Sequence, residues 1–192
     1  GVSHNFGVVA VPVLSWRADH VQSEGRRQLS EGISLSFAVM DLKYSAADVN
    51  GWQTGYALDI QRGARNAQSD NAPSRGAFLQ AAARFRAQLA EIEAMPLAAE
   101  QTRLLASAHR DFIEFMRLDE QIIAAYRQGD EAAVAEATRL VMEDEIRLFE
   151  SISNAVDDLA NSVTLRALER AGKAEVGGQT AKWLMVSTSA VA

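Results

Sequence analysis

The stretch DLKYSAADVNGWQTGYALDI (Asp41–Ile60) lies in the middle of a segment, Leu29–Arg62, that is apolar on two sides when it is read as a helix. A helix with one apolar row has one partner surface, and two rows require burial on two sides. One row contains Ile33, Phe37, Met40, Tyr44, Ala47, Gly51, Thr54 and Leu58. The other contains Leu35, Val39, Leu42, Ala46, Val49, Trp52 or Gln53, Tyr56 and Ile60. The sequence therefore predicts a long helix with a core side and a partner side.

Two glycines lie inside this helix. Gly51 and Gly55 each cost about 1 kcal/mol relative to alanine in a helix interior. With Ala47 they form a row of small residues at intervals of four. Such a row is typical of tight helix packing, and it is equally compatible with room for a small ligand beside the neighbouring polar and aromatic side chains. Both interpretations stay open at this point.

The composition indicates an all-helical protein of one or two domains. The chain has 192 residues, of which 48% are hydrophobic and 7% aromatic, and it contains three prolines. Its formal net charge of −6 at pH 7, with both signs interspersed, gives no basic surface for nucleic acid. Because there is no cysteine, disulfides, thiolate catalysis and c-type haem attachment are excluded.

Three further amphipathic helices are expected after the first. The stretch Arg62–Gly76 is predicted to be a loop, with Ser74 as the N-cap of the second helix. The second helix ends before Pro96, and the third runs from about Leu97 to Gln128. Their apolar rows are Phe78, Ala82, Phe85, Leu89 and Ile92 in the second helix, and Leu105, Ala108, Phe112, Phe115, Asp119, Ile122 and Tyr126 in the third. Gly129 is expected to end the third helix, and Asp130 to cap a fourth that reaches about Arg170.

Short connections favour antiparallel neighbours, so we expect an all-α fold: an up-down-up-down four-helix bundle with long first and fourth helices. Residues 19–172 are assigned to this bundle. Residues 1–18 are interpreted as a membrane-proximal apolar segment, and residues 173–192 as a membrane-proximal segment that enters a second transmembrane helix. A short core helix or strand at each end is the alternative.

The two end assignments depend on the apolar runs FGVVAVPVLSW (Phe6–Trp16) and AKWLMVSTSAVA (Ala181–Ala192). Lys182 and Trp183 stand at the start of the second run, where an ammonium group and an indole ring suit a membrane interface. An even number of antiparallel helices brings both runs to the same end of the bundle. The sequence therefore predicts a membrane at both chain ends.

The residues with catalytic potential form no known catalytic pattern. Glu-x-x-His pairs of di-iron bundles are absent, and so are a Ser–His–Asp order, a phosphate loop and a dinucleotide fingerprint. We therefore expect no enzyme activity, no catalytic residue, no metal and no cofactor. Asp119 and Glu145 lie on apolar rows, and each is interpreted as one half of a structural ion pair with an arginine across the bundle.

Three segments resemble a known family. MDLKYSAADVNGWQTGYALDI (Met40–Ile60) is similar to the first sensor helix of a subgroup of bacterial methyl-accepting chemotaxis receptors of the four-helix-bundle class. FMRLDEQIIAAYRQGD (Phe115–Asp130) and LVMEDEIRLFESI (Leu140–Ile152) resemble its third and fourth helices. The resemblance covers about Gln28 to Arg170. It implies an extracytoplasmic, dimeric sensor domain at the cell membrane, which binds a small ligand and transmits through the fourth helix.

The first helix supplies the candidate sites. Its double apolar row predicts a homodimer, with the interface assigned to Leu35, Val39, Leu42 and Val49. A small-molecule site is predicted around the two glycines from an aromatic ring, a phenol, two amides and a carboxylate, namely Trp52, Tyr56, Asn50, Gln53 and Asp48. Interface packing of the two aromatic residues is the alternative to this site. The alternative to a receptor is a soluble helical adaptor or scaffold that binds protein partners along the first helix.

Overall fold

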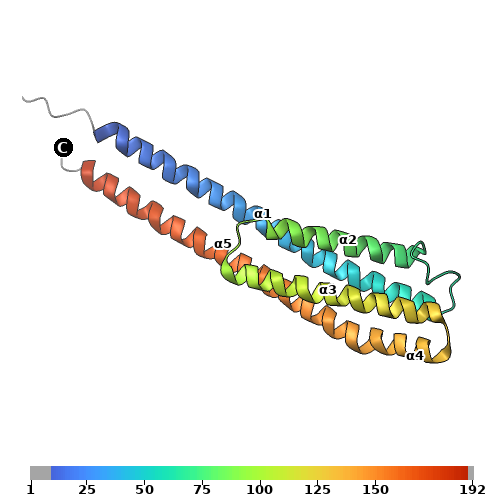
Figure 1. Ribbon diagram of the computed structural model, residues 1–192. Helices are drawn as coiled ribbons and strands as arrows, with labels where there is room; N and C mark the ends of the chain where they lie inside the picture. The colour runs from blue at the N-terminus through green and yellow to red at the C-terminus, as the bar shows by residue number, and fades with distance from the viewer. Residues whose placement is uncertain (1–9, 190–192) are drawn as a thin grey trace, which may run out of the picture.

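The protein is helical throughout the part that the structure describes. The computed structural model describes the backbone of residues 10–189 and the side chains of residues 23–172. The helices are α1 (Ala10–Gln61), α2 (Pro73–Glu93), α3 (Ala99–Gln128), α4 (Glu131–Arg139) and α5 (Ile146–Ser189), and a π-helical turn, η1 (Leu140–Glu145), joins α4 to α5 (Figure 1). No strand occurs between residues 10 and 189, which confirms the all-α prediction.

Gly129 and Asp130, between α3 and α4, have the capping roles that the sequence predicted. Gly129 ends α3 in the left-handed conformation with φ of 76°, which glycine adopts without a steric penalty. The Asp130 side chain accepts a hydrogen bond from the Ala133 N–H at 2.9 Å and caps α4.

The predicted start of α2 was wrong by two residues, because Pro73 is already the first residue of the helix and proline suits that position. Ser74 therefore lies inside the helix, and its hydroxyl donates to Asp59 at 2.6 Å.

The two outer helices are longer than predicted. α1 begins at Ala10, before the expected start at Asp19 or Gln28. α5 continues past Arg170 and Gly172 to Ser189. The assigned boundaries at residues 18 and 172 therefore both fall inside continuous helices. Glycine lowers helix propensity by only about 1 kcal/mol per residue, so a single glycine is a weak stop signal.

The core lies between α1, α2, α3 and α5. α1 packs against α2 and α5, and α3 packs against α4 and α5. Every member of the predicted rows of α2 and α3 is buried. Four phenylalanines form the centre, and the rings of Phe85 and Phe112 lie 4.7 Å apart in a tilted arrangement, which is a favourable geometry for an aromatic pair. The other two rings are those of Phe78 and Phe115.

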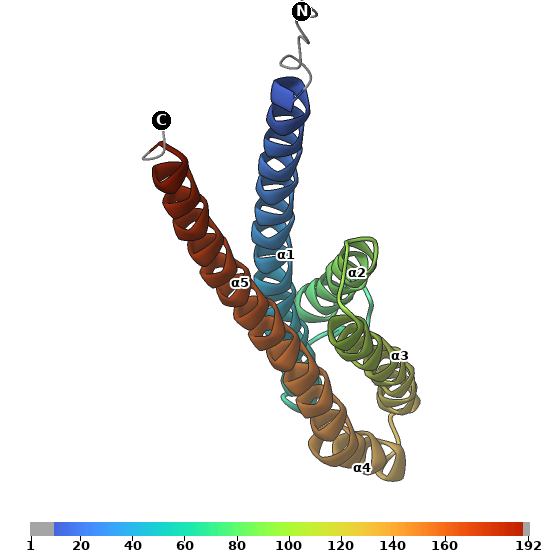
Figure 2. The same cartoon turned by 90° about the vertical axis from the view of Figure 1, so that its left-hand side faces the viewer.

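The ends of α1 and α5 extend beyond the rest of the molecule. Both helices continue past the loop that joins α2 to α3 (Figure 1), and the beginning of α1 and the end of α5 lie at the same end of the protein (Figure 2). In Figure 2 the two extensions spread apart toward the chain ends. Among the described residues, no helix has an apolar stretch of the length and hydropathy that a membrane span needs.

The two apolar rows of α1 have opposite environments. Leu35, Val39, Leu42 and Val49, which were assigned to a homodimer interface, are at most 7% exposed and belong to the core. That assignment is wrong, because this side of α1 already packs against other helices of the same chain. The other row is exposed along its whole length: Ile33, Phe37, Met40, Tyr44, Ala47, Gly51, Thr54 and Leu58. We call these eight residues the exposed α1 row.

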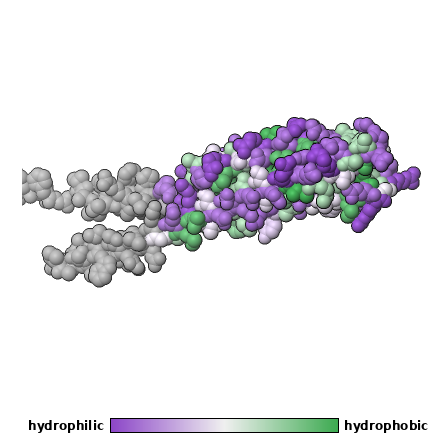
Figure 3. Space-filling view, turned by 90° about the horizontal axis from the view of Figure 1, so that it is seen from below, coloured by the Kyte–Doolittle hydropathy of each residue, from purple (hydrophilic) through white to green (hydrophobic). Residues whose placement is uncertain are grey.

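The exposed α1 row differs from ordinary surface apolar residues by being continuous. Phe37 and Tyr44 are 70% and 68% exposed. Scattered apolar side chains are normal on a protein surface, and the face shown in Figure 3 is mostly hydrophilic with separate hydrophobic patches. Eight residues on one line of one helix form a stripe instead, and a stripe of this kind is a candidate interface.

Candidate functional site: a buried polar cluster

The structure separates the five residues of the predicted ligand site. Gln53 and Tyr56 are buried, at 3% and 0% exposure. Trp52 is 43% exposed and Asn50 is half-buried. Asp48 is exposed, and Arg84 lies 3.6 Å from its carboxylate. The five side chains therefore do not surround one cavity.

The two glycines are not at a close helix contact within the chain. A Cβ added at Gly51 would meet no atom within 4 Å, and one added at Gly55 would lie 4.0 Å from the Ser74 Cβ. Gly51 is a member of the exposed α1 row. The space left by the missing side chain of Gly51 therefore faces the outside of the molecule and not the core.

Gln53 and Tyr56 instead belong to a cluster of five buried polar side chains from four elements. The cluster, called the buried polar cluster below, consists of Gln53 and Tyr56 of α1, Arg75 of α2, Asp119 of α3 and Glu145 of η1. Each of these five residues is at most 3% exposed. The cluster is therefore the point at which α1, α2, α3 and the π-helical turn meet through polar contacts.

An ion pair forms one half of the buried polar cluster. Arg75 Nη1 donates to both carboxylate oxygens of Asp119, at 2.6 and 2.7 Å. The Tyr56 hydroxyl donates a short hydrogen bond to Asp119 Oδ1. The predicted pairing of Asp119 with an arginine is thus confirmed. Charged groups in a core are stable only when they are paired and hydrogen-bonded, and here the carboxylate accepts three hydrogen bonds from two donor groups.

The Arg75 guanidinium is held by aromatic rings and by the loop before α2. Its central carbon lies 4.8 Å from the centre of the Tyr56 ring and 5.0 Å from that of Phe78, within the range of a cation–π contact. Arg75 Nε also donates to Asp70 at 3.3 Å. Asp70 accepts a second bond, of 2.8 Å, from Arg127 of α3. The ion pair thereby connects the α1–α2 loop to the core.

Glu145 forms the other half of the cluster, and no cationic side chain between residues 23 and 172 forms an ion pair with it. The Gln53 side-chain amide donates a short hydrogen bond to Glu145 Oε2. Glu145 Oε1 has no hydrogen-bond partner among the described residues, and neither has the buried hydroxyl of Tyr126. The predicted ion pair between Glu145 and an arginine was therefore wrong. The contact that α1 offers at this position is a neutral amide.

Burial changes the pKa values of these acids. The pKa of Glu145 is raised to about 9, mainly by desolvation and also by the negative charge of Asp119, while the Gln53 bond and the positive charge of Arg75 offset part of the rise. Burial also raises the pKa of Asp119, and its bonds from Arg75 and Tyr56 offset part of that rise. Burial and the charge of Asp119 raise the pKa of the Tyr56 phenol. At neutral pH Glu145 is therefore a neutral carboxylic acid.

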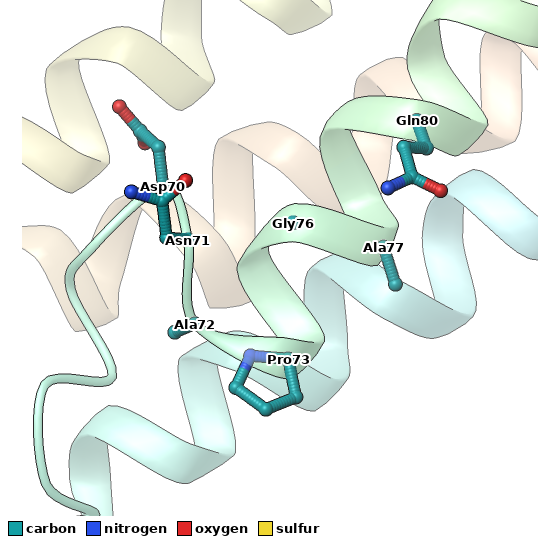
Figure 4. A pocket seen from close by; sticks show the side chains of 7 residues that line it. All are labelled: Asp70, Asn71, Ala72, Pro73, Gly76, Ala77 and Gln80. Carbon is teal, nitrogen blue, oxygen red and sulfur yellow. The ribbon is translucent and has the colours of Figure 1, made fainter.

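Two surface pockets are lined by none of the five residues of the buried polar cluster. The first, of about 310 Å³, lies at the start of α2 and is lined by Asp70, Asn71, Ala72, Pro73, Gly76, Ala77 and Gln80 (Figure 4). Asp70 is the one charged residue among these seven, and in Figure 4 its carboxylate points away from Pro73, Gly76 and Ala77 of α2. The second, of about 210 Å³, lies between the end of α2 and the start of α3, beside His109. No residue of α1 lines either pocket.

The sequence contained a signal for Arg75 that the loop assignment obscured. Arg75 continues the buried row of α2 by one step, because it stands three residues before Phe78 and seven before Ala82. Pro73 at the first helical position would have placed it inside the helix. The role of Glu145 with Gln53 has no comparable signal, since the two residues are 92 positions apart.

Comparisons with protein-family models, with curated proteins and with solved structures find no significant match to this chain. In the described part of the chain no group of three or more His, Asp or Glu side chains is arranged to hold a metal ion. The functional argument therefore depends on the geometry of the exposed α1 row, of the two long helices and of the buried polar cluster.

Proposed function

We propose that the chain is the extracytoplasmic sensor domain of a membrane chemoreceptor, folded as an up-down-up-down four-helix bundle and active as a homodimer. The observation that carries the proposal is the exposed α1 row, a continuous apolar stripe on a helix whose opposite side is already buried. The extensions of α1 and α5 at one end of the molecule support it. Two long helices at one end can connect the domain to a membrane, and a signal can pass along them. The resemblance of Met40–Ile60 to a chemoreceptor sensor helix supports it further.

The spacing of the exposed α1 row fits pairing with a second copy of the same helix. Its intervals alternate between four and three residues from Ile33 to Leu58. This alternation is the heptad pattern in which two helices pack side chains of one into gaps of the other. Ala47 and Gly51 lie in the middle of the row, where small residues let two helices approach closely. A two-fold axis near these residues would place each small residue opposite its mate.

The ligand and the signal path belong to the same proposal. Asp48, Asn50 and Trp52 remain accessible on α1 and offer a carboxylate, an amide and an indole to a small molecule. Directly beneath them, Gln53 and Tyr56 contact Glu145 and Asp119. Since α5 continues from the turn that carries Glu145, a ligand that moves α1 at this level also acts on α5.

A soluble adaptor or scaffold protein is the second candidate. The exposed α1 row favours it to the extent that an amphipathic helix of another protein could occupy the same stripe. The two candidates differ in where the chain ends lie. A receptor requires the loop between α1 and α2 outside the cytoplasm and the segment after α5 directed into the cell, whereas an adaptor leaves both on the same side of the membrane.

Reporter fusions test the proposed topology in the protein as its gene encodes it. A phosphatase reporter inserted next to Asn71, in the exposed α1–α2 loop, is expected to be active, because that enzyme folds only after export. A fluorescent reporter fused beyond Ala192, after the second proposed transmembrane helix, is expected to be active in the cytoplasm. The matched control exchanges the two reporters, and both should then be inactive. An active fluorescent reporter at Asn71 would contradict the receptor proposal and favour the adaptor.

A further inference from the structure

The helix that runs from Glu131 to Ser189 contains a turn of different geometry. Residues 140–145 form the π-helical turn η1, with α-helix directly before and after it. A π-helical turn has one more residue than an α-helical turn, is rare, and occurs frequently at functional sites. The buried residues of η1 are Val141 and Glu145. The turn therefore presents one apolar and one ionisable side chain to the core.

Glu145 holds this turn against α1 through one contact. Its carboxyl group is buried, it accepts a hydrogen bond from Gln53, and its second oxygen has no partner. No lysine or arginine among residues 23–172 forms an ion pair with it. A buried carboxylate in such a place lacks the compensation that an ionised group needs, so the neutral acid is the form that fits the core.

Ionisable groups of three helices interact electrostatically with Glu145. They are Tyr56 of α1, Arg75 of α2 and Asp119 of α3. Arg75 and Asp119 are directly bonded to each other, and Tyr56 donates to that same carboxylate. The positive charge of Arg75 is therefore already engaged, and the negative charge of Asp119 disfavours a second carboxylate nearby.

We propose that Glu145 is a proton-operated latch on the π-helical turn. As the neutral acid it stays in the core and fixes η1 against α1. When it loses its proton to solvent, the carboxylate leaves the core, the bond from Gln53 breaks, and the turn loses its present geometry. Because α5 begins at the next residue, the change is passed into the long helix. This device is built into the fold and does not depend on the chain being a receptor.

Hydrogen exchange on the whole chain tests the latch. After correction for intrinsic exchange rates, the protection of the amides in residues 140–146 is expected to fall at least about tenfold between pH 7 and pH 10 in the wild-type protein. In Glu145→Gln, which keeps the shape of the side chain and cannot ionise, protection should change by less than about twofold. Glu143→Gln is the matched control, because Glu143 is exposed on the same turn, and it should behave like the wild type.

A titration that needs no variant to fold accompanies this experiment. Carbon-13 spectra of the glutamate carboxyl groups should show one glutamate in the wild-type protein that titrates far above the ordinary range, near the pKa of about 9 given above. The resonance should be absent in Glu145→Gln and present in Glu143→Gln. An ordinary titration for every glutamate overturns the latch. So does an equal loss of protection in the wild-type protein and in Glu145→Gln.

Discussion

Replacing Arg75 with methionine is expected to lower the free energy of unfolding by about 3–5 kcal/mol, because the Asp119 carboxylate would remain buried without its cation. The methionine side chain keeps much of the apolar contact with the rings of Tyr56 and Phe78, so the loss reports mainly on the charge. For a chain of this size the loss corresponds to a melting temperature roughly 6–20 °C lower. Urea denaturation followed by circular dichroism measures it.

A second arginine of α2 provides the control for this variant. Arg84 is exposed and lies 3.6 Å from Asp48, and exposed ion pairs contribute little. Arg84→Met should therefore change the free energy of unfolding by no more than about 0.5 kcal/mol. The double variant Arg75→Met/Asp119→Leu should recover part of the loss, since a buried pair replaced by apolar groups leaves no unpaired charge. Equal effects of Arg75→Met and Arg84→Met would show that the buried ion pair does not hold the core.

An arginine at Leu42 is expected to unfold the chain, whereas an arginine two residues earlier, at Met40, is not. Leu42 is fully buried in the core and Met40 is 41% exposed. Leu42→Arg loses the buried leucine and forces an unpaired charge into the core, at a cost of about 4–5 kcal/mol or more. Met40→Arg should change stability by about 0.5 kcal/mol or less. Thermal melts at low protein concentration separate stability from association.

The same pair of variants distinguishes the two rows of α1 in their roles. Met40→Arg should leave the helical signal intact and weaken self-association in sedimentation equilibrium at high protein concentration. Loss of folding in Met40→Arg, or a folded and monomeric Leu42→Arg, would contradict the account. Either result would mean that the row of Met40 lies in the core and the row of Leu42 in the interface.

The periodicity of Leu29–Arg62 predicted that α1 has two apolar rows, and the structure has both. It assigned the wrong row to the partner side, because both rows contain large aliphatic or aromatic residues and the choice depends on the surfaces of α2 and α5. The second half of the exposed row, from Ala47 to Leu58, indicated which row faces the core. Ala47, Gly51 and Thr54 bury little area, whereas Val49 and Tyr56 on the other row can fill a core.

The candidate site was predictable only in part. Tyr56 and Gln53 were selected for their chemistry, and they do meet polar partners, although in a closed cluster and not in a ligand pocket. Asp119 was correctly expected to pair with an arginine, since a carboxylate on an apolar row needs a cation. The pairing of Glu145 with Gln53 depends on the π-helical turn, and the spacing of residues in a sequence does not distinguish an α-helical turn from a π-helical one.

Cysteine cross-linking tests the central claim, that the exposed α1 row pairs with a second copy, most directly. These 192 residues contain no cysteine, so each single substitution adds one thiol to this part of the protein, and the unsubstituted protein is the control for any thiol outside it. In cells that express the protein from its whole gene, Tyr44→Cys and Ala47→Cys are expected to form disulfide-linked dimers on mild oxidation. Glu120→Cys, at an exposed position on α3, should stay monomeric. Cross-linking of Glu120→Cys with none at residues 44 and 47 would contradict the proposed dimer.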